Sequence, residues 1–112
     1  MVEANLDLQI AQAKQAAALA SVTEPRAVSA HYDTNSELIV IHLKSGAVYS
    51  FPSTIAQGLT NADAKLLAEV EITPAGDGLH WETLDVDFTV KGLLAGIFGT
   101  KVWMTELQKR WE

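Results

Sequence analysis

The chain has 112 residues, a formal net charge of −6, 48% hydrophobic residues and no cysteine. This length suits a single domain, and the lack of cysteine excludes disulfides, thiol nucleophiles and thiolate metal sites. The negative charge argues against a broad phosphate-binding surface, and no apolar stretch approaches the ~20 residues that span a bilayer, so we expect a cytoplasmic protein without a membrane segment.

The first predicted element is a helix over residues 4–20, a segment that lacks glycine and proline and is rich in alanine and glutamine. Leu6, Ile10 and several alanines would share one narrow face. Such a face packs closely against a flat surface, either the domain's own sheet or another subunit. Pro25 ends the linker that follows. We therefore divide the chain into residues 1–25, the N-terminal helix and linker, and a single α+β domain over residues 26–112.

Three antiparallel strands are predicted next, over residues 26–32, 37–43 and 47–51. A turn-forming run at residues 33–36 joins the first two, and a three-residue loop that ends in Gly46 joins the second and third. These loops set the expected register of the sheet. One face is then the core and the reverse face is apolar enough to need a cover, for which the first helix is the nearest candidate.

In that register, Ile39 and Ile41 lie opposite Phe51 and Tyr49 on one side. In the first predicted strand, Ala30 and Val28 are expected across from Ile39 and Ile41 of the second. The reverse face carries serine and histidine side chains beside three apolar residues, Leu38, Val40 and Val48.

After Pro52 we expect a short helical turn, and then a middle helix from Thr60 or Asn61 through about Glu69. A fourth strand over residues 69–73 should pair with residues 79–81 across a glycine turn. The buried side of the middle helix would consist of Leu66, Leu67 and Val70.

Residues 84–90 alternate between apolar and polar side chains, which is typical of a half-buried strand. Glycines 92, 96 and 99 follow, and their spacing suggests a close approach of the backbone to another group. An amphipathic helix over residues 101–112 ends the chain, with Trp103, Leu107 and Trp111 on one side.

The run AHYDTNSELIVIHLKSGAVYSFP, followed by AQGLTNADAKLLAEVEITPAGDGLHWETLDVDFTVKGLLAGIFGT, resembles the bacterial family called domain of unknown function 2442. The resemblance covers about residues 26–104. It implies a small α+β fold with an antiparallel sheet, and for some members a gene neighbour that resembles the toxin of a toxin–antitoxin pair. It also favours a helical turn after the LHW run, so strand and turn both stay open for residues 84–90.

The expected fold is thus α+β, with a small antiparallel sheet of about four to five strands, an N-terminal helix, a middle helix and a C-terminal amphipathic helix. The resemblance transfers no catalytic residue, because none is established for that family.

The strongest candidate for chemistry is the segment that contains His80, Glu82, Asp85 and Asp87. Carboxylates beside a histidine can hold a divalent cation or divide acid and base roles. This would make the protein a small metal-dependent or hydrolytic enzyme, provided that the four side chains converge in one cleft. The alternative is an exposed polar face, which we favour. His31 and His42 are expected on one sheet face but not opposite each other.

A nucleic-acid-associated regulator is a further alternative, and it needs a clustered basic surface that only a few residues could supply. They are Lys91, Lys101, Lys109 and Arg110.

We favour a non-enzymatic protein-interaction module that forms a homodimer and binds no cofactor. An antitoxin-like role, in which this acidic chain masks a basic protein partner, fits the charge and the resemblance. The interface candidates are Leu6, Ile10, Leu38, Val40, Trp103, Leu107 and Trp111.

Overall fold

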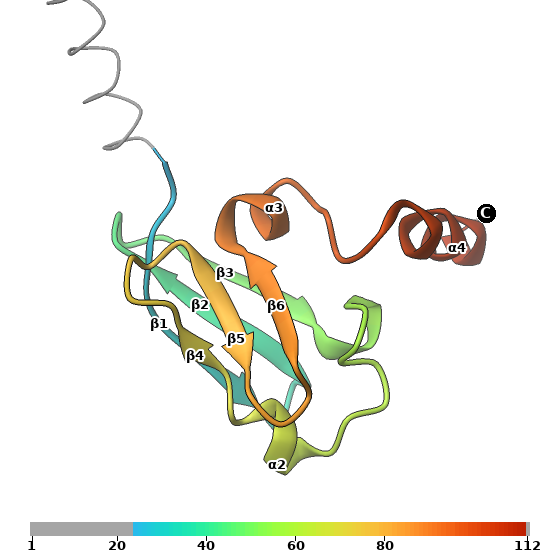
Figure 1. Cartoon of the computed structure of the whole chain (residues 1–112), viewed down its shortest axis with the longest axis horizontal. Helices are drawn as coiled ribbons and strands as arrows, with labels where there is room; N and C mark the ends of the chain where they lie inside the picture. Colours follow the sequence, from blue (N-terminus) through green and yellow to red (C-terminus); the bar gives the residue numbers. More distant parts are fainter. Residues whose placement is uncertain (1–23, 112) are drawn as a thin grey trace, which may run out of the picture.

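The structure is a computed structural model that describes residues 24–111, without the side chain of Trp111. The helix predicted over residues 4–20 lies outside the described residues. The described part is an α+β fold in which two three-stranded antiparallel sheets, β1-β2-β3 and β4-β5-β6, form two layers (Figure 1). The expectation of a single sheet with four to five strands is therefore corrected to six strands in two sheets.

The first sheet contains β1 (Ala27–Asp33), β2 (Leu38–Leu43) and β3 (Val48–Pro52). The predicted pairing of β2 with β3 is confirmed, since Ile39 lies opposite Phe51 and Ile41 opposite Tyr49.

The predicted pairing of β1 with β2 is wrong by two residues, because Ala30 lies opposite Ile41 and not Ile39. The turn is centred one residue later than expected. The Asp33 carboxylate accepts hydrogen bonds from the Ser36 hydroxyl and the Asn35 N–H, and these bonds lower the pKa of Asp33. Val28 lies in a bulge and is exposed, although the predicted register placed it across from Ile41.

The second sheet contains β4 (Glu71–Ile72), β5 (Gly78–Trp81) and β6 (Val86–Thr89). The predicted pairing of the fourth strand with residues 79–81 is confirmed. Of the two conformations considered for residues 84–90, strand and turn, each occurs in part of the segment. Residues 86–89 form β6, whereas Asp85 takes a positive φ of 52° in the turn before it and Val90 begins a helix.

The core lies between the two sheets, which meet along β1 and β4 in Figure 1. The Ala27 N–H donates to the Gly76 carbonyl over 2.7 Å and so links the sheets at that side. The buried side chains combine both layers, which explains why neither sheet folds around a core of its own. The largest of them are Trp81, Phe51, Ile39, Ile41, Leu59, Leu79, Leu93, Leu107 and Val90.

Helix α3 (Val90–Leu94) follows β6 directly and crosses towards the first sheet. The Tyr49 hydroxyl donates to the Leu93 carbonyl over 2.8 Å, and the ring centroids of Phe51 and Phe98 lie 5.4 Å apart. These contacts attach α3 and the segment after it to β3.

The middle helix is shorter than predicted. After the 3-10 turn η1 (Ser53–Ile55), helix α2 covers only Ala64–Leu67. The Thr60 hydroxyl does not cap this helix, because it donates to the Thr54 and Ala56 carbonyls within a series of turns. Leu67 and Val70 are buried as expected, and Leu66 is half-buried.

Helix α4 (Lys101–Trp111) confirms the predicted C-terminal helix. The Trp103 indole N–H donates to the Ile55 carbonyl over 2.9 Å, and Leu107 is buried in the core. None of the helices between residues 24 and 111 has the length and apolar character needed to cross a bilayer.

Candidate functional site

The surface of β1, β2 and β3 that points away from the core carries almost no charge. The register aligns Ser29, His42 and Val48 in one row and His31, Val40 and Ser50 in the next. His31 and His42 share this face without lying opposite each other, as predicted. The observed register makes them diagonal neighbours, and their imidazole rings stack with centroids 5.8 Å apart. We call this surface the uncharged face; it consists of Ser29, His31, Leu38, Val40, His42, Val48 and Ser50.

Asp33, at the end of this face beside Leu38, is the nearest charged residue on these strands. Leu38, Val40 and His42 are half-buried, whereas Val48 is 58% exposed. A surface of this kind, without lysine, arginine or glutamate, is typical of the interior of a protein contact.

The opposite layer has a different outer surface. Its central row places Glu71, His80 and Asp87 side by side on β4, β5 and β6, and Glu82 follows directly after β5. We call Glu71, His80, Glu82 and Asp87 the acidic face. Glu71 is nine positions before His80 in the sequence, and only the pairing of β4 with β5 brings the two residues side by side.

His80 is held between two carboxylates on this face. Its Nδ1 lies 2.6 Å from the Asp87 Oδ1, and its Nε2 lies 2.6 Å from the Glu82 Oε2. These hydrogen bonds, with Glu82 the stronger influence, raise the pKa of His80 above its usual value of 6.5. The carboxylates themselves are largely exposed, so the arrangement is an open surface and not a closed pocket.

The predicted catalytic segment is thus brought together only in part. His80, Glu82 and Asp87 meet, but Asp85 lies in the β5–β6 turn and takes no part. The two ring nitrogens are on opposite sides of the imidazole, so the carboxylates that they bind cannot converge on one ion. Among the described residues, no group of three or more histidine, aspartate and glutamate side chains could hold a metal.

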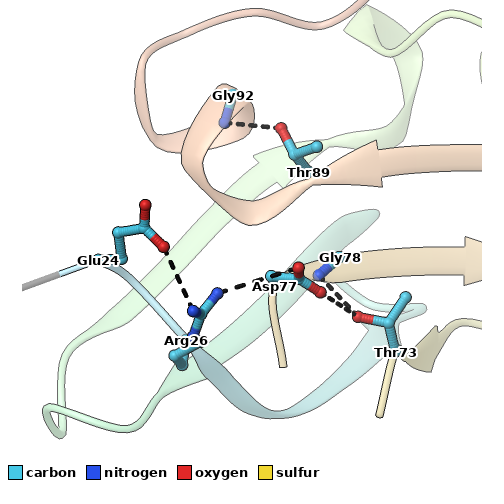
Figure 2. A network of polar contacts seen from close by, with 7 residues as sticks. All are labelled: Glu24, Arg26, Thr73, Asp77, Gly78, Thr89 and Gly92. Atoms are coloured by element: carbon cyan, nitrogen blue, oxygen red, sulfur yellow. Dashed lines mark hydrogen bonds and ion pairs between the residues drawn. The ribbon is translucent and has the colours of Figure 1, made fainter. Parts of the chain in front are cut away.

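Figure 2 shows a separate network that fastens the start of β1 to the turn between β4 and β5. The Arg26 guanidinium lies 3.2 Å from a Glu24 carboxylate oxygen and 4.0 Å from an Asp77 carboxylate oxygen. The Thr73 hydroxyl donates to Asp77 and accepts from the Gly78 N–H. Because each group has a partner, we interpret this network as structural.

The same view contains the beginning of α3, where the Gly92 N–H donates to the Thr89 hydroxyl over 3.0 Å (Figure 2). A hollow of about 410 Å³ lies between α3 and residues 24–26, which precede β1. No signal in the sequence predicts the hollow, since its two walls are far apart along the chain.

The terminal interface candidates have different positions. Leu107 is buried, so it is corrected from a contact residue to a core residue, and Trp103 is half-buried with its indole N–H occupied. Leu6, Ile10 and the Trp111 side chain lie outside the description.

Three of the candidate basic residues, Lys101, Lys109 and Arg110, are on α4, and Lys91 is on α3. Lys109 pairs with Glu106 at 3.3 Å, so the exposed side of α4 has mixed charge.

Comparisons with other proteins place the fold but not the function. Residues 27–99 match the family described as "Protein of unknown function (DUF2442)". A crystal structure of a protein of unknown function from Rhodospirillum rubrum ATCC 11170 is 52% identical, with a TM-score of 0.71, over 73% of this chain and 99% of that chain.

A solution NMR structure of an uncharacterised protein from Chromobacterium violaceum is 30% identical, with a TM-score of 0.68, over 86% of this chain and 87% of that chain. A search of curated proteins finds no match.

Proposed function

Because the chain belongs to the family described as "Protein of unknown function (DUF2442)", we propose a function from its own surfaces: a non-enzymatic interaction module that forms a homodimer through the uncharged face. The observation that carries this proposal is the contrast between the two outer surfaces. The β1-β2-β3 sheet exposes valine, serine and histidine, whereas the β4-β5-β6 sheet exposes carboxylates.

The uncharged face supports self-association because a two-fold contact brings identical residues together. Two acidic faces would repel each other, whereas two uncharged faces would remove valine and leucine side chains from water. The stacked His31 and His42 rings add flat surface to such a contact.

The non-enzymatic part of the proposal is supported by His80. Both of its ring nitrogens are engaged by carboxylates, which leaves neither nitrogen available to a substrate.

Light scattering tests the homodimer. The full chain should have twice its monomer mass, and Val48→Lys should reduce it to a monomer because a charge at the contact would be desolvated without a partner. Val102→Lys is the matched control, since Val102 is an exposed valine on α4, away from this face. A monomeric wild-type protein, or equal behaviour of the two folded variants, would contradict this interface.

We further infer an antitoxin-like role in which the acidic face masks a basic protein partner. The net charge of −6 and the carboxylates of Glu71, Glu82 and Asp87 support a partner of opposite charge. Complementary charge raises the association rate and selects against acidic partners.

Co-expression tests this role. If the product of the neighbouring gene is a basic protein, it should co-purify with the wild-type chain and be lost when Glu71 and Glu82 are both changed to lysine. The Val48→Lys variant should retain it, since Val48 lies on the other sheet. The absence of a complex with the wild-type chain would refute the antitoxin-like role.

A further inference from the structure

Strand β6 forms one edge of its sheet, next to β5 alone. The Val90 N–H donates to the Asp77 carbonyl over 2.9 Å, which sets the alternation of the antiparallel ladder. The backbone N–H and C=O groups of Val86 and Phe88 therefore point towards β5. The backbone groups of Asp87 and the N–H of Thr89 point towards the free edge.

The pairing of β4 with β5 gives the same alternation. The Thr73 N–H donates to the Gly78 carbonyl over 3.0 Å, so Gly78 and His80 face β4 while Leu79 and Trp81 face β6. Within residues 24–111, the Asp87 and Thr89 N–H groups have no hydrogen-bond partner on this free edge.

A hollow of about 600 Å³ runs beside this edge, and residues 84–89 form one of its walls. The other wall includes Gly58, Gly92 and Gly99, together with Ile97, which is 51% exposed. Side chains at Gly58 and Gly92 would clash with neighbouring side chains of the same chain. A Cβ at Gly58 would lie 2.6 Å from the Val86 Cγ2, and one at Gly92 would lie 2.6 Å from the Thr89 hydroxyl oxygen.

At these points the side chains of Val86 and Thr89 already fill the space that a Cβ would need, so the open part of the hollow is the part beside the strand edge. An extended backbone needs open space beside an edge strand, and the main-chain groups of the edge can then pair with it. Ile97 offers an apolar contact for one side chain of the incoming segment.

The charges at this edge indicate the kind of segment that fits. Asp85 and Asp87 line the hollow, and Glu82 lies just before the turn. Lys91 and Lys101 are next in sequence to Gly92 and Thr100 of the wall, but they do not themselves line the hollow. A second copy of β6 would bring Asp87 against an identical carboxylate or close to one, and like charges in such pairs are destabilising.

We propose that the free edge of β6 binds an extended segment of a basic protein, which adds to the β4-β5-β6 sheet as a further strand. This inference rests on the proposed basic partner and specifies how that partner is bound. The main-chain bonds supply the alignment, and lysine or arginine side chains of the segment lie against Asp85 and Asp87.

A peptide of alternating lysine and valine, amidated and fluorescently labelled, is the probe. Fluorescence anisotropy should show binding to the wild-type chain, and NMR should show shifts of the Asp87 and Thr89 amide signals. A peptide of alternating glutamate and valine should not bind.

The decisive comparison is between Asp87→Pro and Asp87→Ala. Both variants remove the carboxylate, but only proline removes the N–H that faces the free edge, a position at which edge strands accept proline. We expect Asp87→Pro to bind the lysine peptide about tenfold more weakly than Asp87→Ala. Circular dichroism checks that both variants are folded, and Thr89→Ala, which keeps its N–H, serves as a second comparison.

Equal affinity of the two Asp87 variants, or failure of the wild-type chain to bind the lysine peptide, would overturn edge pairing. If the neighbouring gene product still co-purifies in that case, the proposed function stands and only this mode of binding fails. If neither the peptide nor the gene product binds, both proposals fail.

Discussion

At the scale of single residues, the fold brings two carboxylates into contact with the His80 imidazole. The imidazole contacts Asp87, which is its partner across the β5–β6 ladder, and Glu82, which is two positions along the chain. Both contacts favour the protonated ring. His80 therefore links the pH of the solution to the stability of this hairpin.

Since the folded state raises the pKa of His80, its stabilising effect is fully present below the usual value of 6.5 and is lost as the pH rises through the folded pKa. We expect the free energy of unfolding of the wild-type chain to exceed that of His80→Gln at about pH 5, and the difference to shrink by about pH 9. Urea unfolding at a series of pH values measures this. A difference that does not vary with pH would show that protonation of His80 does not contribute.

An NMR titration of His80 provides the residue-level control. Glu82→Gln should move the pKa of His80 back towards 6.5, because Glu82 has the largest influence on it.

Gly58 tests how closely β6 packs against the turn that follows η1. Gly58 has a φ of 88°, and a Cβ there would also lie 2.6 Å from the Val86 side chain. We expect Gly58→Ala to lower the free energy of unfolding by about 2 to 4 kcal/mol, from backbone strain and overpacking together. Valine has a stiff side chain and cannot easily move away.

The matched control is Gly46→Ala. Gly46 has a φ of 97°, but a Cβ added there would lie in open space. The free energy of unfolding of this variant should therefore fall only by the cost of backbone strain, about 1 to 2 kcal/mol. Chemical denaturation of both variants would refute the packing argument if the two losses were equal.

At the scale of elements, the short helices depend on the packing of their neighbours. Helix α2 is a single turn, and an isolated helix of this length is unstable in water. It is held by the burial of Leu67 and by the Trp81 indole N–H, which donates to the Leu67 carbonyl over 3.0 Å. A segment of this kind is therefore stable only in contact with β5.

The segment before Glu24 raises a question at the same scale, namely whether it contributes to assembly. Since the proposed contact surface lies entirely on β1, β2 and β3, a version that begins at Thr23 should keep the dimeric mass of the full chain in light scattering. A dimeric full chain with a monomeric truncation would instead make the N-terminal segment the assembly element. If both were monomers, the proposed homodimer would be wrong.

At the scale of the whole molecule, the two sheets have a shared interior and unlike exteriors. This arrangement separates the two proposed contacts in space, so that a homodimer through one sheet leaves the other sheet free. The contacts should also respond differently to salt, because exposed charges are screened and apolar burial is not.

Raising the salt concentration from about 50 mM to about 500 mM should weaken binding of the lysine–valine peptide while the dimeric mass stays constant. Anisotropy and light scattering on the same samples measure both quantities. Peptide affinity that does not depend on salt would contradict the proposal that the carboxylates of Asp85 and Asp87 attract the peptide.

Local patterns in the sequence were sufficient for much of the fold. Alternation and turn residues predicted the pairing of β2 with β3, the pairing of β4 with β5, and the helix that begins at Lys101. They also predicted that the histidines on β1 and β2 share a face. These features depend on neighbours within about ten positions of the chain, where backbone preference and side-chain period act directly.

Contacts between distant segments decided the rest. The Ala27 N–H links the two sheets through the Gly76 carbonyl, and the Thr60 hydroxyl bonds back to Ala56 where the predicted helix would begin. Glu71 joined the acidic face, and Asp85 left the candidate site, because the ladder and one positive φ set their positions. The sequence by itself determined which segments can be strands or helices, whereas burial and hydrogen bonding in the folded chain determined which of them meet.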